Sequence, residues 1–120
     1  MDFWETALTP QEVLTEIRVP SAAGRPWNFQ KFRQRSQEWA IVGIAALGGE
    51  QPSITFVNMG VTPIRAAGVE QALADGAKLE DAAERADEGT SPLSDLWAAV
   101  VYRRHLSKVL MRRALAGIAG

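Results

Sequence analysis

The stretch Trp39-Ala40-Ile41-Val42-Gly43-Ile44-Ala45-Ala46-Leu47 decides the fold of this chain. It is apolar throughout and does not alternate with polar residues, so it suits either a buried strand or a short buried helix. Its β-branched isoleucines and valine, and the Gly48-Gly49 turn that follows, favour the strand. The sequence therefore predicts that residues 39–47 form the central strand of a sheet.

Two flanking segments predict neighbouring strands. Residues 54–59 follow the glycine turn and predict a hairpin partner for the central strand. Residues 27–36 are polar but carry aromatic side chains, which favour a strand. Because Trp27 and Phe29 share one face of that strand while Phe32 falls on the other, we expect a bulge within it.

A further strand is predicted at residues 13–19, where apolar and charged side chains alternate. The apolar residues on one side are Val13, Ile17 and Val19, and the charged residues on the other are Glu16 and Arg18. A period of two is typical of a half-buried strand, and the proline at position 20 would end it. The predicted sheet then has about four strands.

The second half of the chain predicts three helices. Residues 64–74 place Val69 and Leu73 one turn apart, and Gly76 would end this helix. Residues 79–87 predict a short acidic helix. Residues 93–116 predict a long helix, with Ser91 as the N-cap and a proline at the first helical position. Strands followed by helices indicate an α+β fold, in which the helices cover one face of an antiparallel sheet.

Length and composition bound the possible functions. The chain has 120 residues, the size of one domain, and we expect an extended N-terminal arm over residues 1–10 and the domain over residues 11–120. Thirteen Lys and Arg residues against 14 Asp and Glu residues leave a net charge of −1, which gives no broad attraction for nucleic acid. No apolar stretch approaches the ~20 residues of a membrane span.

The absence of cysteine narrows the chemistry further. It excludes a disulfide framework, a thiolate metal site and a cysteine nucleophile in this chain. The N-terminus carries no basic segment followed by an apolar core, so no signal peptide is predicted. Together these features predict a cytoplasmic protein.

Three groups of polar residues have a structural explanation that is simpler than a functional one. His105 is the only histidine, so a histidine metal site is not expected. The acidic residues between 80 and 88 lack the spacing of a calcium loop and predict a solvated helix face. The basic residues between 103 and 113 are expected to offset the dipole at the end of the long helix. We predict no catalytic residue and no metal ligand.

The densest remaining polar set lies beside the central strand. Its members are Lys31, Arg33, Arg35, Gln37 and Glu38. Such a set forms either an ordinary network of ion pairs at a strand end or one side of a ligand site at the sheet edge. No Walker motif and no G-x-G-x-x-G fingerprint accompanies it, so no phosphate-binding loop is predicted.

Several segments, in order, resemble one known module. These are Glu12-Val13-Leu14-Thr15-Glu16-Ile17-Arg18-Val19-Pro20, Lys31-Phe32 with Arg35, Glu38-Trp39-Ala40-Ile41-Val42-Gly43, Gly60-Val61-Thr62-Pro63-Ile64-Arg65-Ala66, Asp95-Leu96, Tyr102-Arg103-Arg104-His105-Leu106 and Arg112-Arg113-Ala114-Leu115. The set is similar to the C-terminal domain of the FAD-binding medium subunit of molybdenum hydroxylases, the carbon monoxide dehydrogenase and xanthine dehydrogenase family. The resemblance spans nearly the whole chain.

The resemblance implies a sheet packed on three helices and a role in electron transfer. In the family, electrons pass from a molybdenum large subunit through a small subunit with [2Fe–2S] clusters to FAD in the medium subunit. The C-terminal domain covers that FAD. The resemblance places Arg35 and Glu38 near the flavin ring, although the family commonly has Asp where Glu38 stands, and Glu38 could instead pair with Arg35.

The family binds the FAD phosphates with glycine-rich loops in upstream domains, and this chain has none. We therefore expect FAD in the full-length subunit and no cofactor on the isolated chain. Two alternatives stay open from the sequence: a stand-alone protein-interaction module that has lost the FAD-binding domains, and a small enzyme with a pocket at the sheet edge.

Overall fold

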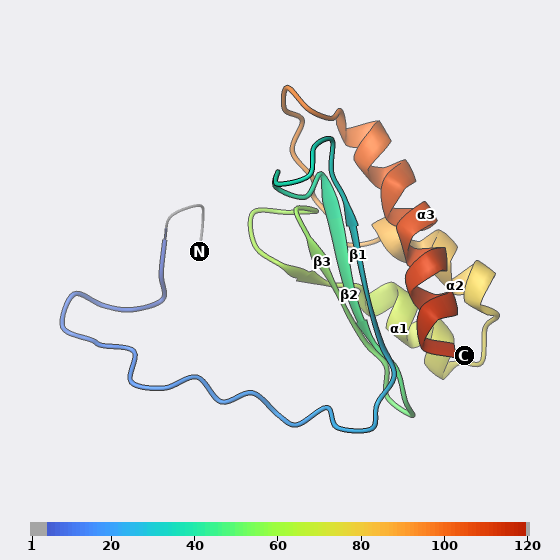
Figure 1. Cartoon of the computed structure of the whole chain (residues 1–120), viewed down its shortest axis with the longest axis horizontal. Coiled ribbons are helices and arrows are strands. Elements are labelled where there is room, and N and C mark those ends of the chain that lie inside the picture. The colour runs from blue at the N-terminus through green and yellow to red at the C-terminus, as the bar shows by residue number, and fades with distance from the viewer. Residues whose placement is uncertain (1–4, 120) are drawn as a thin grey trace.

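The computed structural model describes residues 5–119 and has two layers, a sheet and a group of helices (Figure 1). In chain order the elements are β1 (Trp27–Phe32), β2 (Val42–Leu47), β3 (Ser53–Val57), β4 (Ile64–Arg65), α1 (Ala67–Ala74), α2 (Leu79–Glu84), a 3-10 turn η1 (Arg85–Asp87) and α3 (Val100–Ala119). The predicted α+β fold is confirmed: a four-stranded antiparallel sheet packs on three α-helices.

The sheet is a simple meander in the order β1-β2-β3-β4. A continuous row of partners crosses it, because Gln30 pairs with Ile44, Ile44 with Phe56, and Phe56 with Ile64. Ile44 and Phe56 are both fully buried. The prediction of a central strand is therefore confirmed, although β2 begins at Val42 and Trp39 lies in the preceding loop with 90% of its side chain exposed.

The helices cover one face of this sheet. α3 lies across β1 and β2, α1 contacts β3, and α2 lies between α1 and α3 (Figure 1). Alternate residues of β2 and β3 point into the core between the layers, as the strand period requires. The largest fully buried apolar side chains of this core are Val42, Ile44, Ile54, Phe56, Met59, Val69, Met111 and Leu115.

The opposite face of the sheet carries no helix. Trp27, Phe29 and Val57 lie on it and are 72%, 53% and 41% exposed. β2 contributes Gly43, Ala45 and Leu47 to this face; Ala45 is exposed, and Leu47, which pairs with Trp27, is half-buried. The expectation that both sides of the central strand are buried is thus wrong for this face. An apolar run predicts burial, but alanine and glycine can fill positions that no other layer covers.

Two strand predictions need correction. Residues 13–19 form no strand, and Val13, Ile17 and Val19 are about four-fifths exposed, at 81%, 77% and 82%. Alternation predicts which side of a strand is buried, but a strand also needs a partner, and none of the described residues offers one. The fourth strand is β4, a two-residue segment within the predicted first helix.

The predicted bulge in β1 is also absent, because all six of its residues pair in register with β2. Phe32 simply turns toward the helices, where its ring packs edge-on against Tyr102 at 6.3 Å between centroids. The strand ends at Phe32 rather than at residue 36.

The first and last helices begin later than the sequence predicts. α1 starts at Ala67 and not at residue 64, because Ile64 and Arg65 pair with β3 as strand β4. α3 starts at Val100 and not near residue 93, so the proline at position 92 does not open it. The short acidic helix is confirmed as α2 with its 3-10 continuation.

The packing of β2 leads to a stability prediction. Ile44→Asp should lower the free energy of unfolding by several kcal/mol, because it places a carboxyl group in the core without a partner. Ala45→Asp, one residue away on the exposed face, is the matched control and should cost about 1 kcal/mol or less. Urea unfolding of both variants measures the difference, and equal midpoints would show that β2 is misplaced.

Candidate functional site

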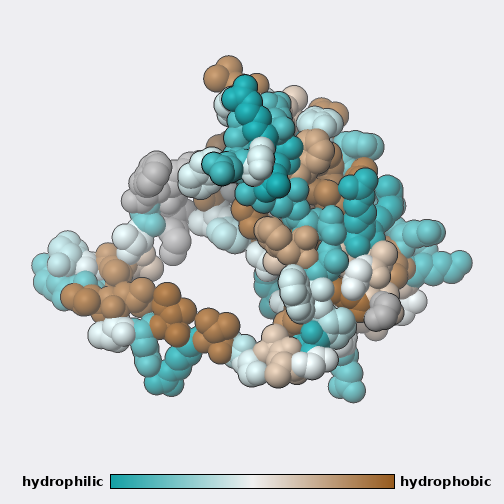
Figure 2. Space-filling view, in the orientation of Figure 1, coloured by the Kyte–Doolittle hydropathy of each residue, from teal (hydrophilic) through white to brown (hydrophobic). Residues whose placement is uncertain are grey.

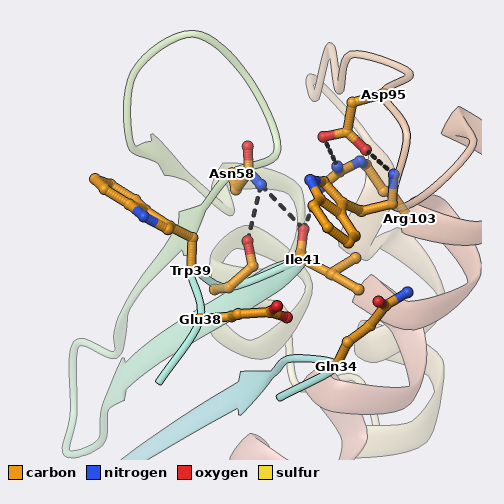
Figure 3. Close-up of a pocket in the computed structure, with 9 residues that line it drawn as sticks. Gln34, Glu38, Trp39, Ile41, Asn58, Asp95 and Arg103 are labelled. Carbon is orange, nitrogen blue, oxygen red and sulfur yellow. Dashed lines mark hydrogen bonds and ion pairs between the residues drawn. The ribbon is translucent and has the colours of Figure 1, made fainter. Parts of the chain in front are cut away.

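The loop between β1 and β2, residues 33–41, borders a cavity of about 260 Å³ at one end of the sheet (Figure 3). Three other segments complete the wall: the end of β3, the loop before α3, and the first turn of α3. The lining residues are Gln34, Glu38, Trp39, Ala40, Ile41, Asn58, Asp95, Trp97 and Arg103. A second hollow of about 360 Å³ lies on the open sheet face and shares Glu38, Trp39 and Ala40 with the first. Aromatic faces therefore lie next to charged and amide groups in both hollows.

Arg103 is the buried charge of this site, with 2% of its side chain exposed. Its Nη1 donates to the main-chain carbonyl of Ile41, and its Nη2 donates to Asp95 Oδ2 at 2.5 Å. Its Nε has no hydrogen-bond partner among the described residues. One guanidinium thus joins α3 both to the loop that precedes it and to the loop before β2.

Asp95 is held from both sides. Its Oδ1 accepts the N–H groups of Trp97 and Ala98, each at 2.9 Å, while its Oδ2 faces Arg103. Desolvation alone would raise the pKa of Asp95, but the two backbone hydrogen bonds and the Arg103 guanidinium together outweigh it and hold that pKa below its ordinary value. The carboxylate is therefore charged at neutral pH.

Asn58 fixes the same loop from the sheet side. It adopts a left-handed backbone, with φ at 62°, a conformation that asparagine tolerates better than most residues. From there its Nδ2 donates to the carbonyls of Ala40 at 2.8 Å and Ile41 at 3.4 Å. Asn58 and Arg103 together hold the last peptides of the loop through main-chain carbonyls.

Arg35 and Glu38, the two predicted cofactor-binding residues, lie in this loop and contact each other. Glu38 Oε2 accepts the backbone N–H of Arg35 at 3.1 Å, and the two charged groups lie 3.6 Å apart. The Arg35 side chain is 79% exposed and that of Glu38 31%. Of the two arrangements expected for Glu38, its pairing with Arg35 is present, and the same carboxylate also lines both hollows.

The rest of the predicted polar set does not form a network. Lys31 and Arg33 are exposed and make no ion pair within residues 5–119. Sequence reasoning found the loop but missed Asn58 and Trp97, and it noted Asp95 only within a family-like segment, without a role in the site. It also assigned Arg103 to the end of the last helix, whereas the residue lies in the first turn of α3 and is buried.

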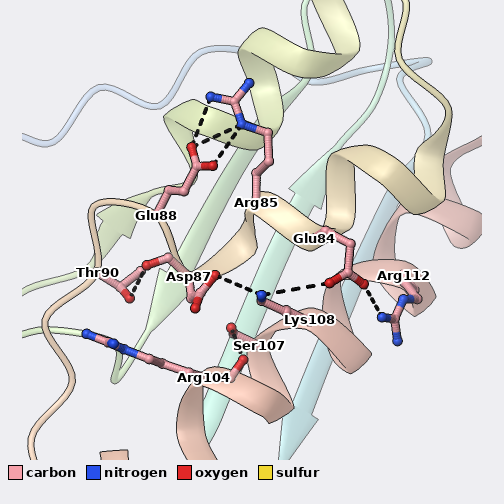
Figure 4. A network of polar contacts seen from close by, with 9 residues as sticks. All are labelled: Glu84, Arg85, Asp87, Glu88, Thr90, Arg104, Ser107, Lys108 and Arg112. Carbon is pink, nitrogen blue, oxygen red and sulfur yellow. Dashed lines mark hydrogen bonds and ion pairs between the residues drawn. The ribbon is translucent and has the colours of Figure 1, made fainter. Parts of the chain in front are cut away.

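The acidic and basic groups mostly neutralise one another (Figure 4). Lys108 lies 3.3 Å from Asp87 and 3.7 Å from Glu84, and Arg112 donates to Glu84. The hydrogen bond from Arg112 lowers the pKa of Glu84. Lys108 and Arg112 of the basic run therefore join α3 to α2 and η1 rather than offsetting a helix dipole, and the predicted solvated acidic face is confirmed, because Glu80, Asp81, Glu84 and Glu88 are exposed.

The remaining candidates carry no chemistry. His105 is exposed on α3, as expected. No group of His, Asp and Glu side chains within residues 5–119 could hold a metal ion. No helix in that part of the chain is long and apolar enough to cross a membrane.

The Asp95–Arg103 pair leads to a prediction on stability. Asp95→Asn keeps acceptors for the Trp97 and Ala98 N–H groups but leaves Arg103 buried without its counter-charge. Because Asp95 is 42% exposed, we expect a loss of about 1–2 kcal/mol at pH 7, below the 3–5 typical of a fully buried pair. Glu88→Gln, in the exposed pair with Arg85, is the control and should cost less than about 1 kcal/mol.

The effect should depend on pH. A lowered folded-state pKa means that the stabilisation is present above the ordinary aspartate pKa of about 3.9 and is lost as the pH falls through the folded value. The difference between wild type and Asp95→Asn in chemical unfolding should therefore shrink below about pH 4. A difference that stays constant down to pH 2.5 would contradict this account of Asp95.

Comparison with known proteins places this geometry in a family. Residues 27–118 match the family model of the CO dehydrogenase flavoprotein C-terminal domain. The carbon monoxide dehydrogenase medium chain of Afipia carboxidovorans is 30% identical over 121 aligned positions, which cover 92% of this chain and 42% of that one. This chain thus spans less than half the length of that relative.

Solved structures agree. Carbon monoxide dehydrogenase from Hydrogenophaga pseudoflava superposes with a TM-score of 0.86 at 29% identity, over 99% of this chain and 45% of that one. Quinoline 2-oxidoreductase from Pseudomonas putida 86 shares the fold, with a TM-score of 0.69 at 24% identity over 80% of this chain and 37% of that one. The expected resemblance is confirmed, and the chain belongs to the CO dehydrogenase flavoprotein C-terminal domain family.

Proposed function

We propose that this domain is the flavin-facing part of a FAD-containing medium subunit of a molybdenum hydroxylase, where it covers the flavin and supports electron transfer from iron–sulfur clusters to FAD. This proposal rests on the two adjoining hollows at the loop between β1 and β2. Glu38 and Trp39 line both hollows. Family membership supplies the flavoprotein context.

The residues at the hollows fit the ring end of FAD. A flavin ring is flat and aromatic and carries hydrogen-bonding atoms along one edge, so it needs apolar faces next to a few placed polar groups. Trp39 and Trp97 supply aromatic surface, and Glu38 and Gln34 supply hydrogen-bonding groups or charge. At about 260 Å³ the cavity is slightly below the usual range of complete ligand pockets, about 300–1,000 Å³, which suits a site shared with another domain.

The phosphate end of FAD does not fit this chain. The glycine pair of the β2–β3 turn is already in contact with the chain's own side chains: a Cβ at Gly48 would meet Pro26 at 2.8 Å, and one at Gly49 would meet Arg25 at 3.3 Å. Arg25 itself donates to the Gly48 and Gln51 carbonyls. The proposal therefore assigns phosphate binding to upstream FAD-binding domains.

When bound, the flavin would supply electron acceptance and release, and the residues of this chain would set its surroundings. Glu38 would place a negative charge and Arg35 a positive charge near the ring, with opposite effects on its reduction. Asn58 and Arg103 would act as positioning residues, because they hold the Ala40 and Ile41 peptides next to Glu38. Trp39, exposed here, would lose contact with water once the FAD-binding domains close over it.

The same proposal names the partners. The curated relative is a medium chain of carbon monoxide dehydrogenase. By this likeness we propose a molybdenum-containing large subunit and a [2Fe–2S] small subunit as partners of the complete protein. The substrate is left unassigned, because it would bind in the large subunit.

The missing phosphate site predicts that the isolated chain does not bind FAD with useful affinity, because only the ring end of the cofactor finds a surface here. Calorimetric titration with FAD should show no saturable heat at micromolar concentrations. A stoichiometric complex with micromolar Kd would contradict the prediction and show that the chain holds FAD by itself.

The charge of Glu38 at the hollows and that of Arg35 beside it predict changes in the redox potential of a bound flavin. In a medium subunit that carries this domain, Glu38→Gln should raise the flavin potential and Arg35→Gln should lower it, since the carboxylate disfavours added electrons and the guanidinium favours them. If each effect is ~1 kcal/mol, the shift is about 20 mV for a two-electron couple.

Redox titration with FAD retained measures both shifts. Glu50→Gln and Arg113→Gln, which remove charges of the same signs far from the hollows, are the matched controls. They should leave the potential within about a few mV of wild type, because salt screens exposed charges at long distance. Potentials unchanged in all four variants would leave Arg35 and Glu38 as an ordinary surface ion pair.

A further inference from the structure

The second hollow, of about 360 Å³ on the open sheet face, has one cation in its wall. Its lining residues are Phe29, Lys31, Gln37, Glu38, Trp39, Ala40 and Val57. The Lys31 side chain is exposed, and no hydrogen bond or ion pair joins its ammonium group to another of residues 5–119. Arg35 lies outside both lining sets and contacts Glu38. Lys31 therefore brings to this hollow a positive charge that no described residue neutralises.

The register of the sheet sets the direction of the Lys31 side chain. Phe29 and Lys31 alternate along β1 with residues such as Phe32 that face the helices, so Lys31 lies on the open face. Lys31 pairs with Gly43, and Gly43 pairs with Val57. Because glycine has no side chain, β2 places nothing between Lys31 and Val57 on this row of the sheet. The ammonium group and the apolar Val57 side chain therefore face the same open space.

The hollow can be reached from outside the domain. α3 covers the opposite face of the sheet (Figure 1), and no residue of the described chain before β1 lines the hollow. That part of the chain, residues 5–26, is an extended arm, and Figure 2 shows open space between its exposed apolar side chains and the body of the domain. A flat group carried by another domain can therefore enter the hollow without displacing a layer of this one.

The polar groups of the hollow match one edge of a flavin ring. The pyrimidine edge of the ring presents two carbonyl oxygens, C2=O and C4=O, with an N–H group between them. An ammonium group only donates hydrogen bonds and a carboxylate only accepts them. Lys31 therefore fits a carbonyl oxygen of this edge, and Glu38 fits the N–H beside it. Phe29, Trp39 and Val57 supply apolar surface for the rest of the ring.

We propose that Lys31 contacts the C2=O end of the flavin ring in this hollow and favours the reduced ring. Reduction places negative charge on that end of the ring, where a neighbouring ammonium group stabilises it. This rests on the proposed function and deepens it, because it names the residue that supplies the positive charge. The effect of Lys31 exceeds that of Arg35, whose charge is paired with Glu38 outside the hollow.

The first test is a redox titration of a medium subunit that carries this domain. Lys31→Gln should weaken two-electron reduction of the flavin about tenfold, which lowers the potential by about 30 mV. Lys31→Arg keeps the charge and should restore the potential. Arg33→Gln is the matched control, since Arg33 is also exposed without an ion pair but lines neither hollow. It should shift the potential by less than half as much.

Sulfite binding to the same subunit gives a second readout that does not depend on turnover. Sulfite adds to N5 of an oxidised flavin through its own lone pair, forms an N–S bond and leaves negative charge on the pyrimidine end of the ring. Its affinity therefore reports a cation at that end. Lys31→Gln should raise the Kd for sulfite about tenfold, whereas Lys31→Arg and Arg33→Gln should keep it within about twofold of wild type.

Three outcomes would contradict parts of this account. A lower melting temperature of the chain alone in Lys31→Gln would show that Lys31 supports the fold, and would overturn the proposal. An unchanged potential and sulfite Kd in Lys31→Gln, with FAD retained and the Glu38→Gln shift present, would overturn the role of Lys31 and leave the proposed function intact. Unchanged values in both Lys31→Gln and Glu38→Gln would overturn the flavin-facing role itself.

Discussion

The bond from Arg103 to the Ile41 carbonyl is the contact on which the candidate site depends. It joins the first turn of α3 to the residue directly before β2, across 62 positions of sequence. The guanidinium is buried, so it needs the charge of Asp95, and Asp95 in turn arranges the loop that leads into α3. The Arg103 side chain thus connects the helix layer, the sheet and the loop before α3.

The two ends of the sheet have different roles in this arrangement. At one end, Asn58 and Arg103 hold main-chain carbonyls of the loop whose Glu38 and Trp39 side chains line the hollows. At the other end, Arg25 occupies the glycine turn and directs the arm outward. The candidate site and the exit of the arm therefore lie at opposite ends of the strands, and a substitution at one end need not disturb the other.

Sequence alone predicted the elements that depend on local pattern. The apolar run of β2, the acidic short helix and the columns of α3 are periodic over enough residues to be recognised. The boundaries failed where a distant partner decides them: β4 is a strand only because it pairs with β3, and residues 93–99 are not helical because Asp95 accepts the N–H groups there. The loop with Arg35 and Glu38 was found as a dense polar set beside the central strand, and family likeness then singled out these two residues, whereas the roles of Asn58 and Arg103 became visible only in three dimensions.

The error at residues 13–19 is informative in a different way. Alternation is typical of a segment that buries one side, whereas the described structure leaves both sides in water. An isolated domain gains nothing from exposed valine and isoleucine at alternate positions, and such side chains favour aggregation. The open sheet face likewise exposes apolar side chains to water, namely Trp27, Phe29 and Val57. Both features are explained together if this chain folds as one part of a larger flavoprotein subunit, in which other parts cover the arm and the open face.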